Sequence, residues 1–458
     1  VSKVTATKTT IEIHPTPLEL GNTSLTLSAV IEPRKGDAPN YKTKWHLNKA
    51  RVRSESLSLY EALRSFGVVP NPWVDMDTVA DIQLSGPLNP LDLKGPFLLD
   101  AKDFLVADRP ANDPEAKHTL FVPQGLAEGH LTIDKNHVVI TAQNFKAGRT
   151  QGSTVVDIGF KSGPLDISIN LPKANLSDFR PLGGAKLKGQ GQLKGRIWGP
   201  FKALQMLGHG HFTNFSATGI DYADDLIATI RSPDLKSIIL ENAKARRGET
   251  LYGGDIGLYF KPTFSLDTNL LISKGRVQDI LGMFMDMGGI EGEILEGAIN
   301  LNGPLFDLDG DADLRLKDVS LFGEVFESGI AKGQMHKGEF TLSEMRFMRN
   351  ENKEGLTLHG SVGRKWALNM NMNADLYLST LSLLNGQTPL KGHLTGNLRL
   401  DNTLFALAPQ GRILLTHTTY ADQKVADSEL RLATADGITQ ITGRLLGDHI
   451  RLDANVDL

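Results

Sequence analysis

The sequence contains no cysteine, so it can form neither a disulfide scaffold nor a thiolate metal site. It has no basic excess either, because 49 lysines and arginines stand against 53 acidic residues and give a formal net charge of −4. A nucleic-acid-binding protein needs a basic stripe, so we expect no nucleic-acid partner. No apolar run is long enough to cross a bilayer, and no signal peptide is visible. Because the chain starts at Val1 and stops at Leu458 within a strand-like stretch, we interpret it as a central fragment of a longer protein.

The composition is that of a folded chain, with 40% hydrophobic and 22% charged residues. Its most regular feature is the stretch LKGHLTGNLRLD, from Leu390 to Asp401, in which every second residue is apolar or glycine and the others are polar. Successive side chains of a strand point to opposite faces. The stretch therefore predicts a strand with one apolar and one polar face.

The same pattern recurs at intervals of about 100 residues, which is the mark of an internal repeat. The other copies are LKGQGQLKGRIWG (187–199), GGIEGEILEGAINLNGP (288–304) and, more faintly, ADIQLSGP (80–87). The alternation of the third copy slips by one residue after Ile294 and resumes at Leu295, which predicts a β-bulge. Short stretches with helical spacing precede the copies, namely LSLYEALRSF, LSDFRPL, KGRVQDILGMFMDM and LSTLSLL.

These patterns predict an all-β fold with a few short helices, built as a tandem array. The approximate units are 1–86, 87–199, 200–303, 304–402 and a partial unit 403–458. No linker interrupts the array, so we expect a single elongated body without a separate globular domain, in which each unit contacts mainly its neighbours.

The predicted sheet would hold roughly 25–35 strands, and twisted sheets of that size curl or close. We expect one long curved antiparallel sheet, folded lengthwise into a trough with an apolar concave face. Glycines on that face would remove bulk where the sheet bends and leave room beside larger side chains. The residues expected to line the trough are Ile82, Leu84, Leu187, Leu193, Ile197, Ile299, Leu301, Leu314, Leu316, Leu390, Leu394, Leu398 and Leu400.

The repeated pattern, L-x-G-x-φ-x-G-x-L-x-φ-x-G-P followed after a spacer by φ-x-G-x-φ-x-L-x-L, resembles the TamB and AsmA-like family of bacterial envelope proteins. The clearest match is GAINLNGPLFDLDGDADLRLKDVSLFG, from Gly297 to Gly323, followed by LKGQGQLKGRIWGPF, from Leu187. The resemblance covers essentially the whole chain. It implies the repeating β-groove, or β-taco, fold of bridge-like lipid transfer proteins.

The resemblance also implies a place and partners. Family members cross the periplasm of Gram-negative bacteria from an N-terminal inner-membrane anchor, and they carry phospholipid toward the outer membrane or assist outer-membrane protein assembly. The anchor and the family's C-terminal domain are absent from this sequence, which fits a fragment. The implied partners are phospholipids, the inner membrane, and an outer-membrane barrel protein at the missing C-terminal end. No cofactor is expected; phospholipid or detergent acyl chains are the expected bound molecules.

Simple energetics favour lipid in such a trough, because each buried CH₂ of an acyl chain contributes about 0.8 kcal/mol. Two alternatives stay open. The apolar faces could pack on one another as a dry sandwich core. The chain could also act as a scaffold or chaperone for outer-membrane protein assembly, through strand addition at exposed end strands.

Candidate catalytic features do not hold up. His209 and His211 could face a metal together, but they align with Asp311 and Asp313 of the next copy, which are outward polar positions. The aspartates of FDLDGDADL lack the glycine and glutamate spacing of a calcium loop. GQGQLKG has no following helix to bind a phosphate, and neither G-x-S-x-G nor H-E-x-x-H occurs. We therefore predict that the protein is not an enzyme.

Overall fold

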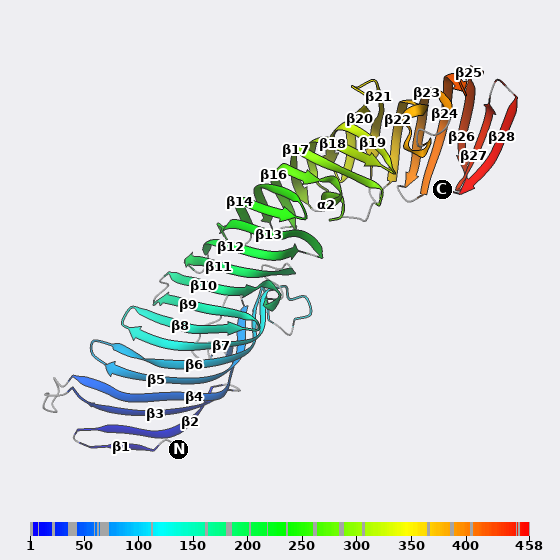
Figure 1. The fold of residues 1–458 in the computed structure, drawn as a ribbon. Helices are drawn as coiled ribbons and strands as arrows, with labels where there is room; N and C mark the ends of the chain where they lie inside the picture. Colours follow the sequence, from blue (N-terminus) through cyan, green and yellow to red (C-terminus); the bar gives the residue numbers. More distant parts are fainter. Residues whose placement is uncertain are drawn as a thin grey trace. The chain divides into compact units, whose positions relative to one another are not determined.

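The computed structural model describes residues 3–7, 9–20, 23–34, 44–58, 60–61, 64, 73–110, 113–160, 164–179, 186–200, 203–217, 219–234, 237–259, 263–283, 288–304, 307–363, 367–384, 389–403, 406–445, 447 and 449–457. The chain forms two compact units, Val1–Ala243 and Lys244–Leu458, called unit 1 and unit 2 below. In the described residues there are 28 strands, all assigned to one antiparallel sheet, and only short helical segments (Figure 1). The predicted all-β, antiparallel fold class is confirmed.

Unit 1 begins with strands whose residues alternate between apolar and polar. Its strands are β1 (Val4–Ala6), β2 (Ile11–Leu20), β3 (Thr23–Pro33), β4 (Trp45–Ser58), β5 (Trp73–Pro87), β6 (Asp92–Ala107), β7 (His118–Asp134), β8 (His137–Ala147), β9 (Thr150–Gly159), β10 (Leu165–Asn175), β11 (Leu187–Gly199), β12 (Gln205–Ala217) and β13 (Ile220–Ser232). A 3₁₀ turn, η1 (Leu176–Asp178), follows β10. Strand β14 (Ser237–Arg247) contains the boundary between the units.

Unit 2 continues in the same manner. Its strands are β15 (Thr250–Tyr259), β16 (Ser265–Arg276), β17 (Ile290–Pro304), β18 (Asp309–Leu321), β19 (Glu324–His336), β20 (Glu339–Arg349), β21 (Glu354–Val362), β22 (Ala367–Tyr377), β23 (Leu390–Thr403), β24 (Ala406–Tyr420), β25 (Gln423–Lys424), β26 (Ser428–Ala435), β27 (Ile438–Leu445) and β28 (Ile450–Asp457). Its helical segments are α2 (Val277–Leu281), η3 (Leu378–Thr380) and η4 (Ser382–Leu384).

Within each unit the strands pair antiparallel in chain order, as the register of neighbours such as β5 with β6 or β17 with β18 demonstrates. The two-residue strand β25 is an insertion, because β24 pairs with both β25 and β26. Six strands separate successive helical segments: β5–β10 precede η1, β11–β16 precede α2, and β17–β22 precede η3. The distance along the chain between successive helical segments therefore matches the repeat of about 100 residues seen in the sequence. The exact borders of the five predicted units stay a prediction.

Three of the four predicted helical stretches contain a helical segment whose bounds are described, and each segment is shorter than its stretch. Half of the stretch LSLYEALRSF lies outside the described residues; among its described residues, Tyr60, Glu61 and Arg64 are helical. The predicted slip in β17 is present, since the register with β18 shifts between Ile294 and Glu296. One detail of the prediction was wrong. Leu295 does not resume the apolar face but is the extra residue of the bulge, and it is 48% exposed.

The core is a series of apolar clusters along the sheet. In unit 2 a cluster of fully buried side chains joins Ile294 of β17, Val319 of β18 and Phe326 of β19. Unit 1 has separate clusters around Phe97, around Leu171 with Phe212, and around Ala29 with Leu47. Each cluster is local, as expected when a strand contacts mainly its neighbours.

Candidate functional site: the apolar face

One face of unit 2 carries an unbroken row of apolar residues across 13 strands. Residues directly opposite each other in a ladder lie on the same face, so the printed registers trace the row from strand to strand. None of its members is polar apart from the tyrosine hydroxyl, and none is fully exposed. The central row, as we call it, is Tyr252, Ile272, Gly297, Leu314, Ala331, Met345, Leu358, Met372, Leu398, Gly411, Leu432, Ile441 and Ala454.

A second row and a third row run on either side of the central row, and both are also apolar throughout. The second row is Gly254, Leu270, Ile299, Ala312, Gly333, Leu342, Gly360, Met370, Leu400 and Pro409. The third row is Gly275, Ile294, Leu316, Gly329, Phe347, Leu356, Ala374, Gly396, Ile413, Leu430, Gly443 and Leu452.

The opposite face carries a polar row from β20 to β28. The residues one step along from the central row form a row of their own, which is Arg346, Thr357, Asn373, Asn397, Arg412, Arg431, Thr442 and Asp453. A single step along a strand crosses the sheet. Unit 2 therefore has one continuous apolar face, and from β20 to β28 its other face carries a row of charged, amide and hydroxyl side chains.

Unit 1 has an apolar face of the same kind, interrupted by one threonine. Its longest row crosses β3 to β13 and consists of Leu27, Val52, Ile82, Phe97, Gly129, Ala142, Thr154, Ile169, Gly195, Gly208 and Ile230. The outer face of this unit is charged. Asp81, next to Ile82, accepts hydrogen bonds from Arg51 and Arg53, and the Arg51 guanidinium is the main reason that the pKa of Asp81 is lowered to about 2.

The residues predicted to line the trough lie on the apolar faces of their own units, half-buried or buried. Leu314 and Leu398 belong to the central row of unit 2, Ile299 and Leu400 to the second row, and Leu316 to the third. The others sit on the same faces at neighbouring positions, and they are Ile82, Leu84, Leu187, Leu193, Ile197, Leu301, Leu390 and Leu394. That they touch lipid stays a prediction.

Glycines on the apolar face make room for large neighbours, as expected from the sequence. A Cβ added to Gly297 would lie 2.5 Å from Cδ2 of Leu314, and one added to Gly329 would lie 2.9 Å from Cδ1 of Phe347. Gly411 has a second reason, because its φ of +144° is rarely adopted by other residues and a side chain there would meet the carbonyl oxygen of Asn397. Small and large residues therefore interlock across the face.

Sequence reasoning missed how the helical turns act on this face. We call η1, α2 and η3 the cover turns, because each sets an apolar side chain on the strand that follows. Leu176 of η1 lies over Gly189, Val277 of α2 over Gly292, and Leu378 of η3 over Gly392. The signal was present in the sequence as the recurring L-x-G or I-x-G at 187–189, 290–292 and 390–392, where three of the copies start.

Burial near and far from the cover turns distinguishes a dry core from an open groove on different parts of the apolar face. Beneath α2 the face is closed: Ile294 is 1% exposed and Phe326 0%, and Val277 and Ile280 pack against them. Farther from the turn, central-row residues such as Met345 and Leu358 are only half-buried. One edge of the face is therefore packed, and the middle keeps access to solvent.

Each cover turn is fastened to the hairpin two strands earlier by a side-chain latch. In unit 2 the Asp279 carboxylate of α2 accepts from the Thr250 hydroxyl (2.8 Å), the Thr250 N–H (3.1 Å) and the Glu249 N–H (2.9 Å). In unit 1 Asp178 of η1 accepts from the equivalent groups of Thr150, the hydroxyl at 2.9 Å and the N–H at 2.8 Å. Thr150 and Thr250 are both fully buried.

The latch of η3 uses the same positions with different chemistry. Glu354, fully buried at the start of β21, accepts from the Tyr377 N–H (2.8 Å) and the Thr380 hydroxyl (2.6 Å). Arg349 donates to Glu354 (3.4 Å) and to Glu324 (3.1 Å). Burial by itself raises the pKa of Glu354, but bonds from Thr380, the Tyr377 N–H and Asn350, with the charge of Arg349, outweigh it and lower the pKa below its usual range.

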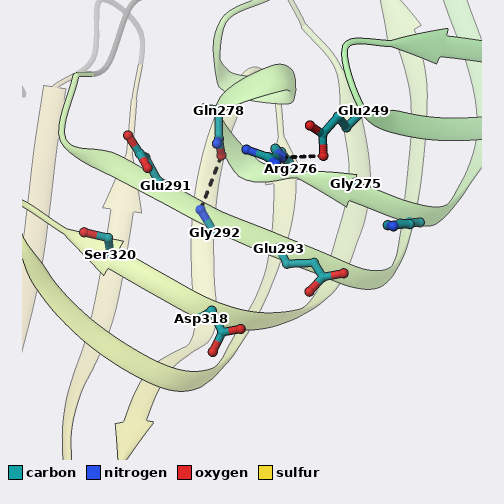
Figure 2. A pocket seen from close by; sticks show the side chains of 10 residues that line it. Glu249, Gly275, Arg276, Gln278, Glu291, Gly292, Glu293, Asp318 and Ser320 are labelled. Atoms are coloured by element: carbon teal, nitrogen blue, oxygen red, sulfur yellow. Dashed lines mark hydrogen bonds and ion pairs between the residues drawn. The ribbon is translucent and has the colours of Figure 1, made fainter.

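A polar pocket of about 360 Å³ lies beside α2, and among the residues of the three apolar rows it touches Gly275 alone (Figure 2). Glu291, Glu293 and Asp318 line it on the sheet side, with Arg276 and Gln278 on the side of the turn. Gln278 accepts a hydrogen bond from the Gly292 N–H at 3.3 Å, and Arg276 pairs with Glu249 at 2.8 Å. The pocket thus contains contacts that hold the turn against β17. Within the ranges that the structure describes, no three histidine or acidic side chains are grouped so as to hold a metal ion.

The polar candidates from the sequence lie on the outer face with partners of their own. His211 contacts Asp225 at 2.6 Å and His209 contacts Thr229 at 3.1 Å, both at exposed positions. Asp313 pairs with Lys332 at 2.9 Å. Asp309 pairs with His336 and accepts from the Lys337 N–H, which is the main reason that the pKa of Asp309 is lowered.

Across the described part of the chain, every helix is too short or too polar to span a bilayer. No family model, no curated protein and no solved structure matches the chain.

Proposed function

We propose that the apolar face shields acyl chains and conducts phospholipid between the inner and outer membranes, with the headgroups kept in water. The proposal includes the place that such a task requires, the periplasm, and attachment of the full-length protein to the inner membrane. The resemblance to TamB and AsmA-like proteins described above motivates this choice among lipid-handling roles.

The single observation that carries the proposal is the central row of unit 2. Thirteen successive strands present an apolar or glycine residue at the same register, without one charged side chain. A dry core needs such a row only where an opposing layer covers it, but apart from the buried Ile272 and Leu398 the residues of this row are only partly buried. A partly exposed apolar track of this length is costly in water and favourable for an acyl chain, at about 0.8 kcal/mol for each CH₂ buried.

Conduction along the track needs no catalysis, because lateral movement only exchanges one apolar contact for another. Each strand adds about 4.8 Å to the row, so neighbouring contacts lie within the length of one acyl chain. Interlocking glycines and leucines keep the surface smooth, so no single position holds a chain tightly.

Photo-crosslinking tests lipid contact. With a photoreactive residue at Leu193, Leu301 or Leu394, we expect phospholipid to be captured, because these side chains lie on the apolar faces. The matched controls are Lys194, Asn302 and Thr395, one step along each strand and on the opposite face. Products are identified by mass spectrometry of detergent-free protein. Equal capture at the two sets would contradict the proposal.

Charge placed in the track tests conduction. Leu301→Asp should block passage, because an ionised carboxylate on the track must be desolvated or hydrated by water that opposes a passing tail. Asn302→Asp, on the polar face, should leave passage unchanged. The measurement is envelope integrity in cells that carry the full-length protein, with abundance followed by immunoblot. Intact function at normal abundance in Leu301→Asp would refute conduction through this segment. A scaffold for outer-membrane protein assembly would give that result, whereas loss of abundance would indicate a packed core.

A further inference from the structure

We propose that the cover turns are latched gates: each latch holds one edge of the apolar face closed, and its release widens the track that lipid can occupy. This inference rests on the proposed function and concerns the regulation of the same face. It is argued below for α2, whose latch lies wholly within unit 2.

The first step is that α2 cannot hold itself in place. It has five residues, far below the length at which a helix is stable in water, and its N-cap residue Arg276 makes no side-chain capping bond. Its position therefore depends on contacts with the sheet.

The second step is that one hairpin supplies hydrogen bonds at both ends of α2. The turn between β14 and β15 supplies Thr250 and the Glu249 N–H to the Asp279 carboxylate. Arg247 of the same hairpin donates to the Asp279 carbonyl oxygen (3.1 Å) and to that of Gly282 (3.3 Å), at the end of the turn. Glu249 also pairs with Arg276 at the start of the turn (Figure 2). Both ends of α2 are thus fixed at one place, as a hinged cover requires.

The third step concerns what the turn covers. The side chains beneath it, Ile294, Val319 and Phe326, are fully buried, and they continue the third row of the apolar face. If α2 swings away, Ile294 and Val319 join the partly buried surface next to the central row, because the strands already carry them on the apolar face. Phe326 keeps the cover of Arg349, which lies over its ring.

The fourth step is recurrence. In four places the N–H of the last residue of a strand donates to the buried side chain that opens the preceding strand: Ser58 to Thr23 (3.1 Å), Asn175 to Thr150 (3.0 Å), Arg276 to Thr250 (2.9 Å) and Tyr377 to Glu354 (2.8 Å). A device repeated once per six-strand period is spaced along the track, as a series of gates would be.

The experiment uses Thr250→Val, which keeps the shape of the side chain and removes the hydroxyl from the latch. Hydrogen exchange of the peptide that contains Val277–Leu281 should accelerate about tenfold or more, because the hydroxyl bond to the Asp279 carboxylate and the acceptor of the Arg276 N–H are lost. A phospholipid with a diazirine in its acyl chain is then photolysed with the protein, and labelled peptides are mapped by mass spectrometry. In the unaltered chain we expect label at Met345 and none at Ile294; in the variant, label should appear at Ile294 as well.

Ser273→Ala is the matched control, since it removes an exposed hydroxyl of β16 that contacts only the Leu251 carbonyl oxygen at 3.5 Å. It should change neither exchange at α2 nor labelling at Ile294. Asp279→Asn changes the acceptor of the latch instead of the donor, and it should give the same faster exchange and the same label at Ile294 as Thr250→Val. If one of the two variants fails to fold, the other still tests the proposal. Far-UV circular dichroism verifies folding of each.

The outcomes separate the two proposals. Unchanged exchange at α2 in both latch variants, or faster exchange without label at Ile294 while Met345 is labelled, would overturn the gate. Absence of label at Met345 in the unaltered chain would overturn lipid binding itself, whatever the exchange data give.

Discussion

The latches of α2 and η3 hold similar turns at equivalent places, but one is built on a hydroxyl and the other on a charge. Thr250 is neutral, and it needs only the Asp279 carboxylate and the backbone around it. Glu354 occupies the same position at the start of its strand and brings three further polar side chains with it, Arg349, Asn350 and Thr380. The α2 turn is therefore held through a single buried hydroxyl, whereas the η3 turn is held through a network of polar side chains around a buried carboxylate.

The difference shows what a buried charge requires. A carboxylate removed from water must be paired and hydrogen-bonded, so Glu354 is accompanied by Arg349, itself only 8% exposed. Arg349 then lies against Glu324 and over the ring of Phe326. Its Nη2 has no hydrogen-bond partner among the described residues. The η3 latch is thus less tolerant of losing one member than the α2 latch.

The largest effect expected from this contrast is that of Glu354→Ala. Removing the carboxylate leaves the Tyr377 N–H without its acceptor and the Thr380 hydroxyl with only the Tyr377 carbonyl oxygen, and it leaves Arg349 buried with only Glu324. Breaking a buried pair in this way costs roughly 3–5 kcal/mol of unfolding free energy. Thr250→Val should cost about 1–2 kcal/mol, because no charge is stranded. Urea unfolding followed by far-UV circular dichroism measures both, and equal costs would contradict the comparison.

A double variant tests whether the stranded charge of Arg349 causes the loss of stability, and its expected effect on the unfolding free energy is smaller. Glu354→Thr with Arg349→Leu rebuilds the hydroxyl type of latch and removes the charge that would be stranded. Residues in one network do not add independently, so the double variant should be more stable than Glu354→Thr alone by about 1 kcal/mol or more. If it is less stable than the single variant, Arg349 serves the fold by some other contact.

The smallest effect is the dependence on pH. Because the pKa of Glu354 is lowered in the fold, its contribution to stability is present above the pKa of the unfolded chain and is lost as pH falls through the folded value. The urea midpoint of the unaltered chain should therefore decline below about pH 4.5 more steeply than that of Glu354→Gln. Parallel pH profiles would show that the carboxylate is not held in its charged form.

Much of the fold could be predicted from the sequence because its strands follow a period of two. The alternation in 390–401 places Leu394, Leu398 and Leu400 on one face, and the structure has them there. The repeat of about 100 residues corresponds to the spacing of the helical segments, which are six strands apart. Leu295 was assigned to the wrong face, since a pattern that slips by one residue does not say which residue is the extra one.

The sequence by itself determined the class of fold and which residues share a face, because strand alternation is a local property of the backbone. Only the tertiary structure decided how far the face is closed. The cover turns have three to five residues each, too few for a reliable periodic signal. Their places depend on Thr150, Thr250 and Glu354, which lie 26 to 29 residues from their latch partners in the turns. Bonds between residues so far apart in the chain form only once the sheet has brought the hairpin and the turn together, so the apolar pattern alone could not reveal them.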